Sequence, residues 1–177
     1  MLVHLVLTII GLDRPGLVQL VSSRVADHGG NWLESRLCHL GGQFAGIARV
    51  EVPAEKVADL RQAVKQLEAQ GLRVAVDAGE GAVLVAGGIS ATIELVGHDR
   101  PGILRNVASV LSAHGVNVEE LSSECVSAPM GGGTLFKARV RVSVPPAVKL
   151  DSVRADLEKI AADLMVDLTL RPETHLG

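Results

Sequence analysis

Gly11-Leu-Asp-Arg-Pro-Gly16 is a short motif that the chain repeats as Gly97-His-Asp-Arg-Pro-Gly102, 86 positions later. At this shift, residues 8–32 and 94–118 share ten identities in 25 positions. Unrelated sequences of ordinary composition would share about two. A second block, Phe44 to Pro53, matches Phe136 to Pro145 at a shift of 92. A chain of 177 residues suits one ordinary domain or two small ones, and the repeat predicts two.

The domain boundaries are predicted from where the two copies begin and end. We expect a first domain over residues 1–78, a linker over 79–89 and a second domain over 90–177. The second copy carries about six extra residues within 127–133, ending in Gly131-Gly-Gly133. Because this stretch lacks the context of a phosphate-binding motif, it predicts a flexible hairpin loop. Whether residues 83–85 of the linker add a short strand is left open.

Both copies contain the same order of predicted elements. A β-rich run, 3–10 or 92–96, ends at the repeated motif, and apolar residues at helical spacing follow it. A His-Gly pair ends each helix, and the strand after it begins at Asn31 or Asn117. The helical apolar residues are Leu17, Leu20, Val21 and Val25 in the first copy, and Leu104, Val107 and Leu111 in the second.

The third strand of each copy has the clearest pattern, in which apolar and polar residues alternate with period two. In the second copy the apolar residues are Phe136, Ala138, Val140, Val142 and Val144. A proline, an amphipathic helix and a closing strand (73–77 or 165–171) follow. The order βαββαβ, found twice, predicts an α+β fold of two ferredoxin-like domains in tandem. Each would be a four-stranded antiparallel sheet with two helices on one face.

Composition excludes several classes of function. Three aromatic residues, a net charge of −3 and a pI near 6.1 argue against direct binding of nucleic acid, which relies on stacking and basic surfaces. No signal peptide and no uncharged run of membrane-spanning length is evident, so we expect a cytoplasmic protein with no membrane partner. Cys38 and Cys125 predict reduced thiols, with a disulfide between them left open.

The motifs resemble a known family. Asp-Arg-Pro-Gly after the first strand and Gly-x-Asn before the second resemble the ACT domain, a small-ligand regulatory module. Residues 31–37 and 42–44, with Ala128-Pro-Met-Gly131 in the second copy, extend the likeness to the glycine cleavage system transcriptional repressor family. That family consists of two tandem ACT domains, and the resemblance covers nearly the whole chain.

The resemblance implies a regulator that senses a small amino acid, glycine foremost, between domains. It also implies that the protein, as a homodimer, restrains a LysR-type transcriptional activator by protein contact. A helix N-terminus suits a carboxylate, and an Asn amide can both donate and accept hydrogen bonds. The implied ligand-binding residues are Asp13, Arg14, Pro15, Gly16 and Asn31 in the first copy, and Asp99, Arg100, Pro101, Gly102 and Asn117 in the second.

Each of these residues also has a purely structural interpretation. Asp is a favoured helix cap, Arg in a loop is usually solvated, and Asn after Gly is a common turn residue. The basic stripe of Lys137, Arg139 and Arg141 predicts a solvated face, with docking of a protein partner left open. His28 and His114 lack further ligands at metal spacing, so no metal and no cofactor is expected.

No catalytic constellation is evident, because Cys125 has no neighbouring base in the sequence and no Gly-x-Ser-x-Gly motif occurs. The prediction is therefore a non-enzymatic regulator. Three alternatives are left open: an amino-acid-responsive regulatory subunit of a metabolic enzyme, an enzyme that uses Cys125 or a histidine, and a dimerisation module with empty sites.

Overall fold

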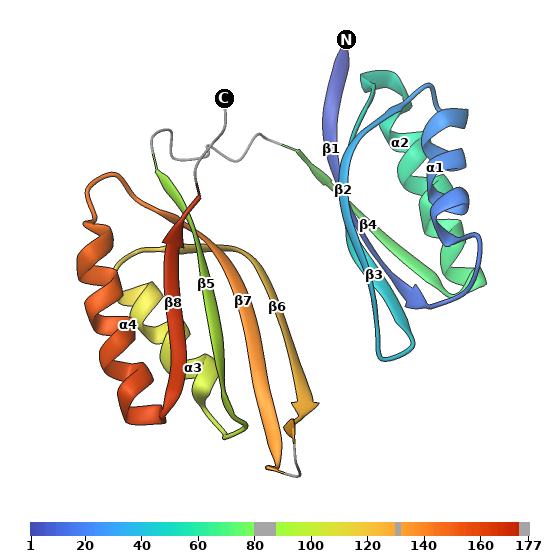
Figure 1. Ribbon diagram of the computed structural model, residues 1–177. Helices are drawn as coiled ribbons and strands as arrows, with labels where there is room; N and C mark the ends of the chain where they lie inside the picture. Colours follow the sequence, from blue (N-terminus) through green and yellow to red (C-terminus); the bar gives the residue numbers. More distant parts are fainter. Residues whose placement is uncertain (80–87, 130–131, 174–177) are drawn as a thin grey trace. The chain divides into compact units, whose positions relative to one another are not determined.

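The computed structural model describes residues 1–79, 88–129 and 132–173, and the chain divides into two compact units, Met1–Ala82 and Val83–Gly177. Each unit has the predicted βαββαβ order (Figure 1). Most of the predicted linker (79–89), the short strand considered at 83–85, and Gly131 lie outside the described residues. Those predictions remain predictions.

The first unit is an antiparallel sheet of strand order β2-β3-β1-β4, with both helices packed on one face (Figure 1). The central strands β1 and β3 pair from Leu2 opposite Pro53 to Leu12 opposite Gln43. Short 3₁₀ turns, Ala54–Lys56 and Gln66–Gln70, flank the second helix. The elements are β1 (Leu2–Leu12), α1 (Leu17–Asp27), β2 (Asn31–Leu40), β3 (Gln43–Pro53), α2 (Val57–Lys65) and β4 (Leu72–Ala78).

The second unit repeats this arrangement with the sheet order β6-β7-β5-β8. Its hairpin between the second and third strands is longer, as the extra residues predicted. The elements are β5 (Ile89–His98), α3 (Ile103–Ala113), β6 (Asn117–Ser127), β7 (Thr134–Val144), α4 (Leu150–Leu164) and β8 (Val166–Pro172). None of the helices in the described ranges is long and apolar enough to cross a membrane.

One hydrophobic core lies between sheet and helices in each unit, and the period-two pattern of the third strands correctly predicted which residues enter it. Ala48, Val50 and Val52 are buried in the first unit, as Ala138, Val140, Val142 and Val144 are in the second. One prediction for α3 is wrong. Leu104 is 37% exposed, and its neighbour Ile103 takes the core position, because the helix begins at Ile103 and buries Val107 and Leu111 one and two turns later.

Candidate functional site

The two Asp-Arg-Pro-Gly loops connect the first strand of each unit to its first helix, and both are anchored in the same way. The backbone N–H of Asp13 donates to the carbonyl of Gly42 at 3.0 Å. The backbone N–H of Asp99 donates to the carbonyl of Thr134 at 2.9 Å. Each loop is therefore held against the hairpin that joins the second and third strands of its own sheet.

A left-handed glycine ends each loop directly before the helix. Gly16 has φ 92° and ψ 0°, and Gly102 has φ 94° and ψ −2°, a conformation that L side chains rarely adopt. The first helical hydrogen bonds run from Leu20 N–H to the Gly16 carbonyl and from Asn106 N–H to the Gly102 carbonyl. The N–H groups of the intervening residues point out of the helix end, where an anion is stabilised.

The interpretation of Asp13 and Asp99 as helix caps is wrong. The residue at the cap position is glycine in both units, and within the described residues no side chain caps α1 or α3. The aspartates lie three residues earlier, and their carboxylates contact the second strand of their unit instead. The first turns of both helices thus keep unpaired backbone donors next to the loop.

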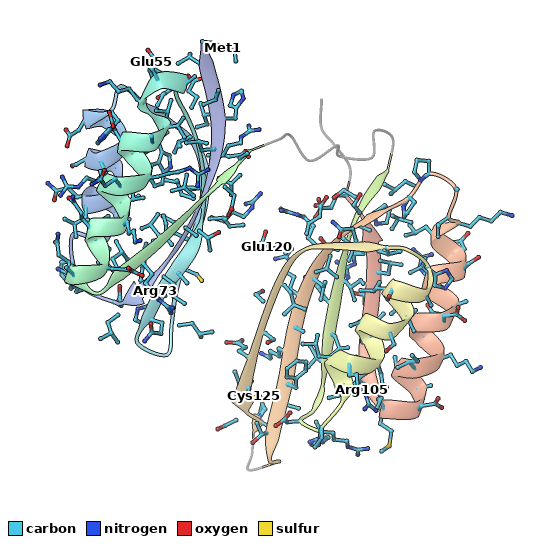
Figure 2. The ribbon with its side chains drawn as sticks, turned by 180° about the vertical axis from the view of Figure 1, so that it is seen from behind. Met1, Glu55, Arg73, Arg105, Glu120 and Cys125 are labelled. Carbon is cyan, nitrogen blue, oxygen red and sulfur yellow. The ribbon has the colours of Figure 1, made fainter. Side chains whose placement is uncertain are left out.

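Asp13 and Asp99 contact equivalent positions of the second strand. Oδ2 of Asp13 lies 2.5 Å from Nδ1 of His39 on β2. Asp99 accepts a hydrogen bond from the thiol of Cys125, which lies near the end of β6 (Figure 2). His39 and Cys125 are 86 positions apart, the same shift as the loops, so the two units use different side chains for one contact. Neither contact could be predicted from the repeat, because His39 and Cys125 are different residues and a repeat is found by matching identical ones.

The environment of Cys125 favours the protonated form of its thiol. Desolvation by neighbouring protein atoms raises the pKa of Cys125 above its ordinary value, and the negative charge of Asp99 and the hydrogen bond to its carboxylate raise it further. Cys38 and Cys125 are both exposed free thiols. A raised pKa lowers the thiolate fraction at neutral pH, which is the reverse of what a nucleophilic cysteine needs.

We expect Asp99→Asn to make Cys125 several-fold more reactive toward iodoacetamide at pH 8, because losing the carboxylate charge lowers the thiol pKa and increases the thiolate fraction. Peptide mass spectrometry would follow both cysteines, with Cys38 as the internal reference. The matched substitution Asp13→Asn, in the other unit, should leave the Cys125 rate unchanged. Equal Cys125 rates in the wild type and Asp99→Asn would contradict the role given to Asp99.

The structure separates the loop of each unit from the Asn of the same unit. Asn31 lies opposite Glu51 and Leu12 opposite Gln43, eight residues apart along β3. At the usual strand rise this is about 27 Å. Asn117 and His98 have the same eight-residue separation along β7. A loop and an Asn from one unit therefore do not form a single site for a small ligand.

The remaining predicted residues have local contacts. The guanidinium of Arg14 donates to the carbonyl of Gln70 at 3.0 Å, which ties the loop to the turn before β4. The amide of Asn31 donates to Oε1 of Glu51 at 3.3 Å. Pro15, Arg100 and Pro101 are exposed.

The recurring histidines lie at the ends of α1 and α3. Nδ1 of His28 lies 2.7 Å from the carbonyl of Arg24, and Nε2 of His114 lies 2.8 Å from Oδ2 of Asp156 on α4. Across the described residues, no three His, Cys, Asp or Glu side chains form a group that could hold a metal ion. The structure therefore gives these histidines contacts that are local to each unit.

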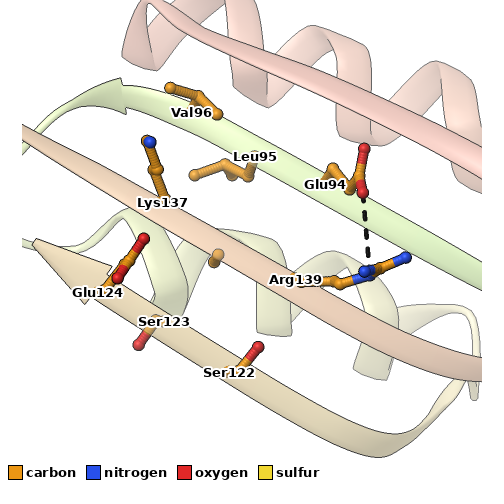
Figure 3. Close-up of a pocket in the computed structure, with 9 residues that line it drawn as sticks. Glu94, Leu95, Val96, Ser122, Ser123, Glu124, Lys137 and Arg139 are labelled. Atoms are coloured by element: carbon orange, nitrogen blue, oxygen red, sulfur yellow. Dashed lines mark ion pairs between the residues drawn. The ribbon is translucent and has the colours of Figure 1, made fainter. Parts of the chain in front are cut away.

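An open, shallow groove of about 350 Å³ lies on the helix-free face of the second sheet, and none of the predicted site residues lines it (Figure 3). Two members of the predicted basic stripe form ion pairs: Arg139, which lines the groove, and Arg141, which does not. Arg139 lies 3.8 Å from Glu94. Arg141 lies 3.3 Å from Glu119 and 3.2 Å from Glu120. This pairing neutralises much of the positive charge that a nucleic-acid surface would need.

Comparison with known proteins confirms the two modules that the sequence repeat predicts. Residues 3–77 and 91–162 each match a family model of the ACT domain. The UPF0237 protein MK1213 of Methanopyrus kandleri is 31% identical over 84 residues, which are 47% of this chain and 87% of that protein.

Two solved structures match nearly the whole chain. An unknown protein from Galdieria sulphuraria has a TM-score of 0.88 at 26% identity, covering 98% of this chain and 100% of its own. A protein proposed to be a glycine cleavage system transcriptional repressor has a TM-score of 0.72 at 18% identity, covering 99% of each chain. At 18% identity the second likeness concerns the fold alone.

Proposed function

The chain belongs to the ACT-domain family, with one module in each half, and from this we propose that it is a non-catalytic sensor of a small amino acid, glycine foremost. In this proposal it acts in the cytoplasm and regulates transcription by contact with a LysR-type activator of glycine cleavage genes. The motifs that resemble the glycine cleavage system transcriptional repressor family favour glycine as the ligand and transcription as the regulated process.

The observation that carries the proposal is the repeated loop geometry. Gly16 and Gly102 agree within a few degrees in φ and ψ, and each precedes a helix whose first turn has no side-chain cap among the described residues. Three backbone N–H groups at such an end can donate to an α-carboxylate, which the helix dipole also stabilises. Space around Gly16 is open, since a Cβ placed there would meet no atom within 4 Å.

The Asn residues supply the second kind of group that a zwitterion needs. An amide oxygen can accept from the ligand ammonium, and the amide N–H₂ can donate to its carboxylate. The loop and the Asn of one module lie at opposite ends of its sheet, so each module offers these two kinds of polar group at separate places.

Contact with a protein partner, rather than with DNA, fits the charge of the molecule. The net charge is −3, and Arg139 and Arg141 of the basic stripe on β7 are paired with glutamates. A regulator of this charge would affect transcription through another protein that binds the DNA.

Isothermal titration of the full chain against a panel of amino acids tests the proposal. We expect saturable binding, with glycine or a close analogue strongest and large side chains weaker. Flat titrations across the whole panel would reject the sensor. Affinity purification tests the partner separately: recovery of a metabolic enzyme in place of a transcriptional activator would favour the regulatory-subunit alternative.

A further inference from the structure

The helix-free face of the first sheet has two halves of different chemistry. Even-numbered residues of β1 and odd-numbered residues of β3 and β4 lie on this face, because the other residues of each strand point to the core. The half near Asn31 is polar and carries His4 and Glu51, together with Arg49, which is ion-paired with Glu34 at 3.2 Å. The half near the Asp-Arg-Pro-Gly loop instead combines exposed hydrophobic side chains with two arginines.

We call this second half the cationic apolar patch. Ile10 lies opposite Arg73, and Ile47 lies opposite Arg36. Across the described residues, neither arginine side chain makes an ion pair or a hydrogen bond. The residues between the members are uncharged, so both charges of the patch are positive. The patch consists of Ile10 (38% exposed), Leu12 (68%), Leu40 (78%), Ile47 (51%), Arg36 and Arg73, of which Figure 2 labels Arg73.

The second sheet shows that the fold does not require this composition. Arg139 takes the position that Ile47 has in the first unit, and it is paired with Glu94. Asp167 takes the position of Arg73. Two modules with the same core pattern thus differ on this surface. Hydrophobic side chains that are exposed together indicate a binding surface.

We propose that the cationic apolar patch binds an acidic amphipathic helix of a protein partner. Arg36 and Arg73 lie on the two edge strands, β2 and β4, so three strand spacings, about 14 Å, separate them. A helix with its side chains is about 10–12 Å wide, so carboxylates on its two flanks can reach both guanidinium groups. The four hydrophobic side chains between the arginines would contact the apolar stripe of that helix.

The patch borders the loop of the proposed amino-acid site. Leu12 directly precedes Asp13, whose backbone N–H donates to the carbonyl of Gly42 at 3.0 Å, and Leu40 lies two residues before Gly42. A partner helix on the patch would therefore lie next to this loop. The inference rests on the proposed function for the existence of a protein partner, but binding of the helix needs no amino acid.

An anionic membrane is the other surface that hydrophobic and basic side chains can meet. Recognition of anionic lipid uses clusters of about four to eight basic residues, and the patch has two. Glu34, Glu51 and Asp77 lie on the same face of the sheet, and a flat membrane would bring these carboxylates against the headgroups. A helix can cover the patch alone, so the charges favour a helix.

A designed peptide provides the test. It has about 18 residues, with leucines in one helical stripe and glutamates on both flanks, and carries fluorescein. Fluorescence anisotropy with the full chain, without amino acid, should show saturable binding. A peptide with lysines in place of the glutamates should bind at least about 10-fold more weakly. If the acidic peptide does not bind, the proposal is overturned, whereas flat amino-acid titrations reject only the sensor.

Charge reversal tests the two arginines. The double variant Arg36→Glu with Arg73→Glu should weaken binding of the acidic peptide at least about 10-fold. The control is Lys137→Glu with Arg171→Glu, which reverses two exposed basic residues on the helix-free face of the second sheet and changes the net charge equally. It should bind as the wild type does. Equal losses in both double variants would overturn the proposal, because net charge alone would then attract the peptide.

A third variant tests the hydrophobic part without adding charge. Ile47→Thr keeps a β-branched residue at a half-exposed strand position and should weaken peptide binding about fivefold. Circular dichroism and Trp32 fluorescence should match the wild type in every variant. Folded variants that keep full affinity would overturn the proposal. Binding of the wild type to phosphatidylserine vesicles, lost in Arg36→Glu with Arg73→Glu, would also overturn it and assign the patch to a membrane.

Discussion

Gly46→Ala should destabilise the first unit by about 3 kcal/mol, at the upper end of the usual range for overpacking. Gly46 lies in β3 opposite Leu37 of β2. A Cβ at this glycine would lie 2.1 Å from the carbonyl oxygen of Arg36 and 2.7 Å from the Cα of Leu37. Since both are backbone atoms, no rotamer change relieves the clash, and β2 must move away from β3.

The chain contains its own control and its own reporter for this variant. The equivalent residue of the second unit is Ala138, which lies opposite Ser123, so Ala138→Gly should cost only about 1 kcal/mol. Trp32 is the only tryptophan and packs against the first core, so its fluorescence follows the unfolding of the first unit alone.

For a unit of this size, thermal denaturation followed by Trp32 fluorescence should shift by roughly 10–20 °C in Gly46→Ala. Far-UV circular dichroism, which reports on both units, should then show two separated transitions. If the fluorescence midpoint of Gly46→Ala shifts no more than the midpoint of Ala138→Gly does, the sheet accommodates the added methyl group without a large loss of stability.

Side-chain periodicity predicted the fold because it is a local property of each strand and helix. Alternation along β7 translates directly into a buried and a solvated face, and the 86-residue repeat made each unit a check on the other. Leu104 shows the limit of the method. A helical stripe allows either of two neighbouring residues to face the core, and only the observed helix start selects Ile103.

The site was harder to predict because its contacts are between distant residues. Asp13 is of a residue type that is favoured at the N-cap of a helix. Its carboxylate instead contacts His39, 26 residues away, and Gly16 takes the cap position. Gly16 and Asn31 are close in the sequence but far apart in space, so their separation could not be predicted from their spacing. Helix α1 carries the chain from one end of the sheet to the other, so the two ends of that helix cannot share a ligand.

Asn31→Ala and Asn117→Ala should each weaken glycine binding by about 10- to 100-fold, the cost of losing a hydrogen bond to a charged group. The two should differ, because Glu51 beside Asn31 can also accept from the ligand ammonium, while Asn117 lies opposite Ser143. Titration calorimetry gives both affinities, and Trp32, adjacent to Asn31, reports on the first.

Gln62→Ala, which removes an exposed amide on α2, is the matched control and should bind glycine as the wild type does. If both Asn variants also retain wild-type affinity, the ligand does not contact these amides, and the binding site lies elsewhere on the modules.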